Sequence, residues 1–213
     1  MRVESVNAAH DVDVLRVGTR RVETGIRKLP VGRGRIEPLG LAGDLVVDTE
    51  AHGGPDQAVY LYSREDYDWW EREVGEPHPA GSFGENLTLS SFGADDVRIG
   101  DRFRVGEALL EVTAPRIPCG VFATHVRRSE WVKRFAAAER PGLYARVLEP
   151  GDVAAGDPAE RLGSANGGPT VVELMRVWYE PDAAPERLER LLQAPLAERA
   201  RAVLETRLAK ALA

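Results

Sequence analysis

The sequence predicts a mainly β domain, barrel-like or sandwich-like, with short helical insertions and a small α-helical unit after it. Three observations lead to this fold class. Short runs rich in β-branched and aromatic residues recur between Gly and Pro turns from residue 11 to about residue 163. Within that region only two segments have helical spacing, whereas beyond it three helical stretches follow one another, separated by prolines. We therefore expect a β-rich domain over residues 1–163 and a helical unit over residues 164–213.

Three stretches carry the strand signal. VDVLRV (12–17) is a short β-rich run, and GRIEPLGLAGD (34–44) looks like a strand that runs into a glycine-rich turn. VRIGDRFRVGEALLEV (97–112) predicts a hairpin, because Gly106 and Glu107 fit a two-residue turn with glycine at its first central position. Before that turn the apolar residues stand at odd-numbered positions, so they share one face of the predicted strand. The apolar residues after the turn continue this face.

The two helical insertions carry large aromatic residues. In SREDYDWWEREV (63–74), Ser63 is suited to cap the first backbone amides, and Asp66 favours the positive end of the helix. Tyr67, Trp70 and Val74 then recur at helical spacing. A second helix is expected to begin near Ser129, and its apolar side consists of Trp131, Val132 and Phe135. We interpret both aromatic sets as anchors of the core and not as a cofactor-binding motif.

The three helical stretches of the C-terminal unit are TVVELMRVWY, APERLERLLQA and LAERARAVLETRLAKALA. Leucine and other apolar residues form a stripe along the second and third of them. We expect this unit to pack against the domain or to form a homodimer. Its charged face offers an alternative role, the docking of an electron donor.

Composition limits the partners of the chain. The 213 residues include 28 basic and 34 acidic side chains, for a formal net charge of −6. This balance argues against a surface that binds nucleic acid or an anionic membrane, but it allows a small anionic ligand held by a few local cations. The first residues lack the apolar core of a signal peptide, and no apolar run reaches membrane-spanning length, so we expect a cytoplasmic protein.

A first candidate site is the stretch from His52 to Asp56. Gly53 and Gly54 let the backbone bend tightly and expose its amides to a ligand, and a histidine beside them suits ligand orientation or proton transfer. The alternative is a plain turn between two strands. On these residues alone, the plain turn is the favoured interpretation.

Two further segments are weaker candidates. GSFGENLTLSSF holds the carboxylate of Glu85 and the amide of Asn86 at the mouth of a strand. ETGIRKLP brings amides, a hydroxyl and two cations together, in Thr24, Gly25, Arg27 and Lys28. Such a set suits a phosphate, although it lacks the spacing of a P-loop.

Cys119, the single cysteine, lies in PRIPCG three positions after Arg116. A neighbouring guanidinium favours the thiolate, which is the form that reacts or binds a metal. Structural zinc is excluded because four scattered histidines and one cysteine lack the paired spacing of such sites. The residues alone leave three roles open at similar weight: a metal or redox ligand, a nucleophile, and an inert buried thiol.

Six of these segments, in this order, resemble the MOSC family, named for the C-terminal domain of molybdenum cofactor sulfurases. They are TGIRKLPV, LGLAGD, HGGPDQAVYLYSREDYDWW, FGENLTL, VRIGDRFRVGEALLEV and PRIPCG. RPGLYARVLEPGDVAAGD extends the resemblance to Asp157. The C-terminal helices are similar to the three-helix appendage of the bacterial stand-alone subgroup, which includes reductases of N-hydroxylated purines.

The resemblance implies a barrel-like domain that binds the molybdenum cofactor (molybdopterin), a pyranopterin that chelates molybdenum and ends in a phosphate. It makes Cys119 the metal ligand, supported electrostatically by Arg116. It assigns the anionic end of the cofactor to Thr24, Gly25 and Lys28. The cavity motifs are His52, Gly53, Gly54 and Asp56, then Glu85 and Asn86. From these motifs we take His52, Asp56 and Glu85 as catalytic candidates for delivering protons.

The function expected from the resemblance is reduction of small N-hydroxylated compounds to amine and water, independent of pyridoxal phosphate. A separate electron-donor protein is required, because the chain has no flavin motif and no set of cysteines for an iron–sulfur cluster. One alternative is a cofactor carrier or a sulfur relay that uses Cys119. Another is a scaffold that has lost the cofactor, because Glu23 and Gln57 stand where relatives often have lysine.

Overall fold

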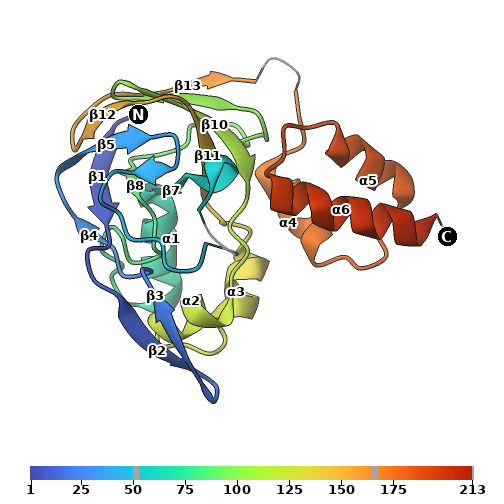
Figure 1. Ribbon diagram of the computed structural model, residues 1–213, viewed down its shortest axis with the longest axis horizontal. Helices are drawn as coiled ribbons and strands as arrows, with labels where there is room; N and C mark the ends of the chain where they lie inside the picture. The colour runs from blue at the N-terminus through green and yellow to red at the C-terminus, as the bar shows by residue number, and fades with distance from the viewer. Residues whose placement is uncertain (50–52, 165–166, 213) are drawn as a thin grey trace.

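The computed structural model describes residues 1–49, 53–164 and 167–212. Figure 1 shows a β-rich body with a helical unit extending from one side of it. The strands are β1 (Val3–Ala8), β2 (Asp13–Val17), β3 (Arg20–Thr24), β4 (Leu29–Pro30), β5 (Arg33–Glu37), β6 (Gly40–Leu41), β7 (Val59–Ser63), β8 (Leu87–Leu89), β9 (Arg102–Val105), β10 (Ala108–Ala114), β11 (Leu143–Glu149), β12 (Gly151–Ala154) and β13 (Ala159–Gly163). The helices are the 3₁₀ helix η1 (Pro55–Gln57) and α1 (Arg64–Val74), α2 (Gly120–His125), α3 (Trp131–Ala138), α4 (Val171–Trp178), α5 (Pro185–Leu192) and α6 (Glu198–Ala211).

The largest sheet has eight strands in the order β13-β9-β10-β11-β7-β8-β1-β4. Adjacent strands of this sheet are antiparallel, except β7 and β8, which run parallel. Because a parallel pair needs a crossover connection, the chain passes through α1 between these two strands. The expected hairpin is confirmed: β9 and β10 meet at Gly106 and Glu107, with Ala108 paired to Val105 and Gly106 at φ 54°. β2 and β3 form a separate two-stranded hairpin, and β12, β5 and β6 form a three-stranded sheet.

A closed barrel, as expected from the sequence, is not found among the described residues. β13 and β4 are the edges of the eight-stranded sheet and do not pair with each other. β4 has only two residues and ends at Pro30, which has no N–H to donate to a further strand. The chain then continues into β5, which pairs with β12 and β6. The body is therefore a sheet-dominated fold with an open main sheet.

β7 separates two cores. Val59 and Leu61 lie in the aliphatic core, whereas Tyr60 and Tyr62 project from the opposite face into an aromatic cluster, because successive side chains of a strand alternate. Tyr60 and Tyr144 contact each other there, with ring centroids 4.9 Å apart. This aromatic face forms the floor of the candidate site.

The expected helical insertions are confirmed as α1 and α3. Ser63 caps α1, since its hydroxyl accepts a hydrogen bond from the backbone N–H of Asp66 at 3.0 Å. Four aromatic side chains of these helices are buried in the aromatic cluster, in agreement with the interpretation as core anchors; they are Tyr67, Trp70, Trp131 and Phe135. A third insertion, α2, was not expected. Its six residues are too few to show helical periodicity.

The C-terminal helices α4, α5 and α6 confirm the helical unit expected from the sequence. They pack around Leu174, Leu188, Leu191 and Leu204, all of which are buried. The unit is tied to the sheet, since the N–H of Ala197 donates to the carbonyl of Thr113 in β10 at 3.1 Å. No helix in the described part of the chain is both long enough and apolar enough to pass through a bilayer.

Candidate functional site

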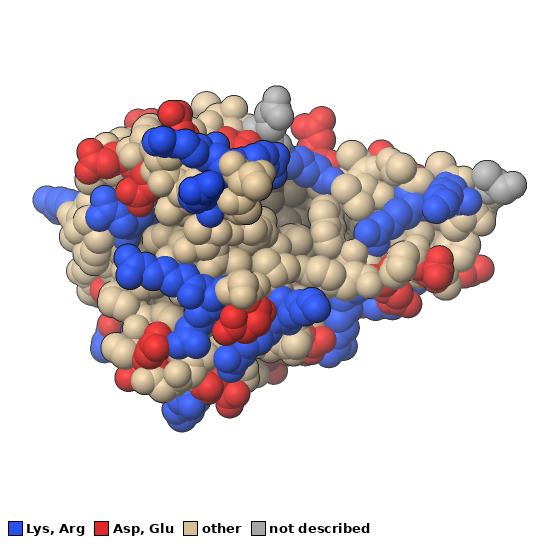
Figure 2. Space-filling model, turned by 90° about the horizontal axis from the view of Figure 1, so that it is seen from below, with Lys and Arg blue, Asp and Glu red and all other residues tan. Residues whose placement is uncertain are grey.

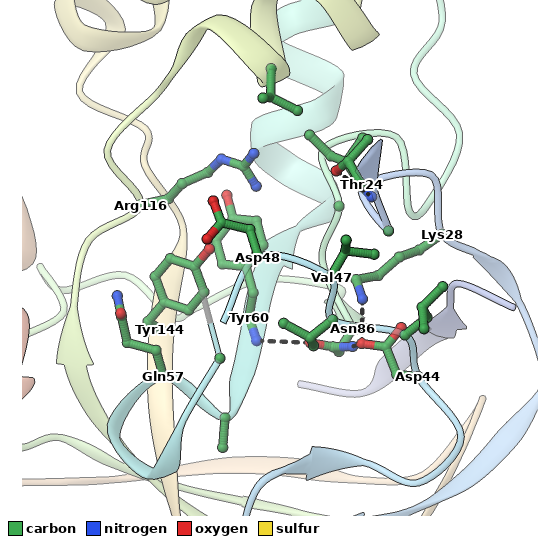
Figure 3. Close-up of a pocket in the computed structure, with 18 of the residues that line it drawn as sticks. Thr24, Lys28, Asp44, Val47, Asp48, Gln57, Tyr60, Asn86, Arg116 and Tyr144 are labelled. Carbon is green, nitrogen blue, oxygen red and sulfur yellow. Dashed lines mark hydrogen bonds and ion pairs between the residues drawn. The ribbon is translucent and has the colours of Figure 1, made fainter. Parts of the chain in front are cut away.

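A pocket opens beside Cys119, with about 630 Å³ of empty space counting its mouth (Figure 3). Its walls come from the segment between β3 and β4, the segment after β6, η1 and β7, the turn before β8, and the loop between β10 and α2. The structure brings together seven residues that the sequence singled out: Thr24, Gly25, Lys28, Gly53, Asn86, Arg116 and Cys119. These residues come from four separate segments of the chain, and only the fold places them around one space.

Arg116 is a buried cation at this pocket. Its side chain reaches in from the side opposite Lys28 and Asp44 (Figure 3), and the residue is 4% exposed. One Nη donates to the carbonyl of Phe83, and the guanidinium carbon lies 4.6 Å from the centroid of the Phe122 ring. Nε has no hydrogen-bond partner within the described structure. A buried donor without a partner is costly, so this atom marks a place for an acceptor.

The charge of Arg116 is retained despite its burial. Burial alone would lower the pKa of the guanidinium, but the neighbouring Tyr144, Tyr60 and Cys119 raise it above the ordinary value of arginine. Cys119 is thus close enough to Arg116 for the two to interact electrostatically. The thiol of Cys119 is free and partly exposed. A permanent cation therefore lies beside an accessible sulfur.

Lys28 belongs to a buried polar cluster with Asp44 and Asn86. Its ammonium forms an ion pair with Asp44, whose side chain is 5% exposed. Asp44 also accepts hydrogen bonds from Asn86 Nδ2 at 2.8 Å and from the backbone N–H of Ala9 at 2.8 Å. Burial lowers the pKa of Lys28, and the negative charge of Asp44 opposes that effect. Lys28 is therefore paired with a carboxylate, whereas Arg116 forms no ion pair with any residue in the described ranges.

Gly25 allows the wall between β3 and β4 to come close to the next segment. A Cβ atom at this position would lie 2.0 Å from the carbonyl oxygen of Leu45, so only glycine fits. Next to it, the hydroxyl oxygen of Thr24 accepts a hydrogen bond from the N–H of Ile26 at 3.2 Å. Thr24 lines the pocket, and its hydroxyl still has a hydrogen to donate.

Asp56 does not line the pocket. Its carboxylate accepts a hydrogen bond from the backbone N–H of Glu198, at the start of α6, and pairs with Arg146 at 3.0 Å. Gly54 precedes η1 at φ 79°, a backbone conformation that glycine adopts readily, and it also lies outside the pocket lining. Gly54 thus shapes the turn before η1, whereas the side chain of Asp56 connects η1 to α6 and β11. His52 lies outside the described residues.

Glu85 is fully buried beneath the pocket and does not line it. Its carboxylate accepts hydrogen bonds from the Tyr67 hydroxyl at 2.7 Å, the Gly81 N–H at 2.6 Å and the Thr88 hydroxyl at 2.7 Å. Burial raises its pKa, although these hydrogen bonds favour the charged form. The arrangement fixes the turn that carries Asn86, and it gives Glu85 no route to a ligand in the pocket.

Several pocket residues were not singled out from the sequence as site residues. Asp44 lies at the end of LGLAGD, and nothing in that segment shows that Asp44 meets Lys28. Tyr60 lies in a strand, where alternation predicts that Tyr60 and Tyr62 share a face but not that a pocket adjoins it. Asp48 and Tyr144 also line the pocket. Their placement depends on long-range packing.

A larger cleft adjoins the pocket, with about 1590 Å³ of empty space counting its mouth. Figure 2 shows the molecule hollowed between the body and the helical unit, with mostly uncharged walls and Lys and Arg side chains around the rim. The cleft and the pocket share Asp48, Gln57, Cys119, Val121 and Tyr144. They are therefore two parts of one connected space, with Cys119 at their junction.

Arg199, from α6, connects the helical unit to the pocket wall. Its guanidinium donates to the side-chain oxygen of Gln57 at 2.6 Å and to the carbonyl of Thr49 at 2.7 Å. Through this contact the helical unit places a cation beside Gln57, from a distant part of the chain.

Comparison with known proteins identifies the family. A model of the MOSC domain matches residues 48–160. The chain belongs to the MOSC domain family. A second model, the YiiM-like 3-alpha helix domain, matches residues 169–211 and covers α4, α5 and α6. The MOSC match includes Arg116 and Cys119, and the helical match includes Arg199, so the connected space lies where the two matched regions meet.

Similar proteins support the same assignment. The crystal structure of YiiM from Geobacillus stearothermophilus superimposes with a TM-score of 0.78 at 27% identity, covering 97% of this chain and 98% of that one. YflK, an uncharacterized protein of Bacillus subtilis, is 36% identical over 86% of this chain and 84% of its own length. A protein named Reductase from Gibberella moniliformis is 30% identical over 70% of this chain, which is 28% of its own length. This MOSC protein thus shares its whole fold with YiiM.

Proposed function

We propose that this MOSC protein is a molybdenum-cofactor-dependent reductase of N-hydroxylated compounds. The observation that carries the proposal is the pairing at the pocket of an accessible thiol, Cys119, with the buried Arg116, whose Nε has no partner within the described residues. The MOSC family is associated with the molybdenum cofactor, and one relative is named Reductase. Both points favour a redox role for the pocket.

The residues at the pocket fit the cofactor. Among the described residues, no group of three or more His, Cys, Asp or Glu side chains could hold a metal ion alone. A metal that brings ligands of its own, as a dithiolene-chelated metal does, would need only Cys119 from the described residues. Arg116 and Thr24 offer donors for an anionic group, and Gly25 keeps the wall beside them open. Cys119 would bind the metal, and these residues would hold the anionic end.

The proposed reaction is balanced by two electrons and two protons. R–NH–OH, two electrons and two protons give R–NH₂ and water, with cleavage of the N–O bond. When bound, the cofactor supplies a metal centre that changes its oxidation state by two. The electrons come from a separate flavin- or iron–sulfur-containing donor protein.

Within the protein, Arg116 would stabilise negative charge beside the thiolate of Cys119, in a site partly shielded from water. Protons would come from solvent at the open cleft or from His52, the predicted donor that precedes Gly53 in the sequence. Asp56 and Glu85 are occupied by structural hydrogen bonds, so we give neither a proton-transfer role.

The test is turnover by protein made in a host that synthesises the molybdenum cofactor. With a chemical reductant, we expect reduction of benzamidoxime or hydroxylaminopurine, and a loss of at least 100-fold in Cys119→Ser, because a direct metal ligand is removed. Wild-type protein from a host unable to make the cofactor is the control. Full cofactor content without turnover would instead favour the carrier or sulfur-relay role.

A further inference from the structure

The cleft beside the pocket has two apolar walls. One wall consists of Leu174 and Trp178 from α4 together with Ala200 and Val203 from α6. Pro115 and Ile117, just before Cys119, contribute to the opposite side. Trp178 is half-buried and makes no aromatic contact with another described residue. Its indole therefore offers the cleft an apolar surface that no other described aromatic ring covers.

The β2–β3 hairpin forms a third side of the cleft. Val17 and Arg20 are cross-strand partners and so project from the same face, which is the face that lines the cleft. Val17 packs close to the loop, since a Cβ on Gly120 would lie 3.0 Å from Val17 Cγ1. Arg20 is therefore the cross-strand partner of Val17. Val17 in turn packs on Gly120, the residue that follows Cys119.

The arginines that line the cleft differ in whether their side chains already have hydrogen-bond partners. Arg199 donates to Gln57, Gly53 and Thr49 and is occupied. Arg20 is exposed, and its side chain forms no hydrogen bond or ion pair with any residue that the structure describes. Its neighbour Arg21 lies on the opposite face of the hairpin, paired with Arg16. The cleft therefore has apolar walls, and on its hairpin side it has the cation of Arg20, whose side chain has no partner among the described residues.

We propose that this cleft binds the body of the substrate, and that it prefers a planar aromatic N-hydroxylated compound bearing a carboxylate. The aromatic ring packs against Trp178, the carboxylate pairs with Arg20, and the N–O group lies toward Cys119. This inference rests on the proposed function, because it assigns the reacting end to the pocket. It makes the helical unit and the hairpin the elements that determine specificity.

The test compares two probes, benzamidoxime and 4-carboxybenzamidoxime, by calorimetric titration and, on cofactor-loaded protein, by steady-state kinetics. Arg20→Gln is expected to weaken binding of the carboxylate probe about fivefold and to leave the uncharged probe unchanged, because an exposed ion pair contributes up to about 1 kcal/mol. Arg21→Gln, on the outer face, is the matched control and should change neither. Trp178→Ala should weaken both probes about fivefold, and Trp178→Phe should restore most of the loss.

Several results would overturn the proposal. They are equal binding of the two probes to the wild type, an equal effect of Arg20→Gln on both probes, or no binding of either. The predicted binding pattern without any N–O reduction would refute the proposed function and leave the cleft as a binding site for aromatic carboxylates. Reduction of both probes with no effect of Arg20→Gln or Trp178→Ala would refute the cleft assignment alone.

Discussion

At the residue scale, the two buried charges of the site differ in what balances them. Lys28 is paired with Asp44, while Arg116 is held by a carbonyl and aromatic rings and keeps a donor without a partner in the described structure. A charge that is already paired contributes less to ligand binding than one that is not, because its partner must be displaced or shared. Arg116 is therefore the cation that an anionic group at this pocket would meet first.

Glu85 gives a prediction about a residue that the sequence suggested as catalytic. Glu85→Gln should lower the free energy of unfolding by about 1–3 kcal/mol, because the amide would place a donor against groups that all donate to this carboxylate. A denaturant melt measures this. For the folded fraction of the Glu85→Gln variant, KM and kcat should stay near the wild-type values. A large fall in kcat with unchanged stability would show instead that Glu85 takes part in the chemistry.

At the element scale, the chain positions the site through loops between short strands. The segment from β10 to α2 carries Arg116 and Cys119, and the turn before β8 carries Asn86. The strands and the capped helix α1 could be predicted because alternation, turn residues and N-caps are local signals. The open sheet could not, because closure depends on whether two distant edge strands pair.

The same distinction applies to the candidate site. Cys119 with Arg116, and Thr24 with Gly25, stood out because a reactive residue lies beside a glycine, proline or cation in the sequence. Asp44 and Arg199 did not, because each acts on a segment more than ten residues away in the chain. The family resemblance placed Asp56 in the cavity, yet its carboxylate accepts a hydrogen bond from the N–H of Glu198 at the start of α6. Local motifs therefore locate the site, and packing decides which way each side chain points.

Arg199 provides a prediction for the helical unit. Arg199→Ala should reduce cofactor retention several-fold, because it removes the hydrogen bonds that hold Gln57 and Thr49 at the pocket wall. Arg201→Ala is the matched control on α6, since Arg201 donates to the carbonyls of Leu192 and Ala194 within the helical unit. Both variants should lose about 1–2 kcal/mol of stability. Equal pterin content in the two variants, measured after purification, would contradict a positioning role for Arg199.

At the scale of the whole molecule, the helical unit completes a space that the β-rich body begins. The body supplies the pocket with Arg116 and Cys119, and α4 and α6 supply a wall of the cleft that opens from it. The net charge of −6 is compatible with this, because the site uses a few local cations and not a basic surface. The electron-donor protein and the homodimer stay predictions.

We propose that the pocket beside Cys119 holds the molybdenum cofactor. Metal analysis together with pterin release, on wild type and Cys119→Ala purified from a host that makes the cofactor, tests it most directly. We expect near-stoichiometric molybdenum and pterin in the wild type, with metal lost or altered in the variant. Wild-type protein free of both molybdenum and pterin, although folded, would contradict it.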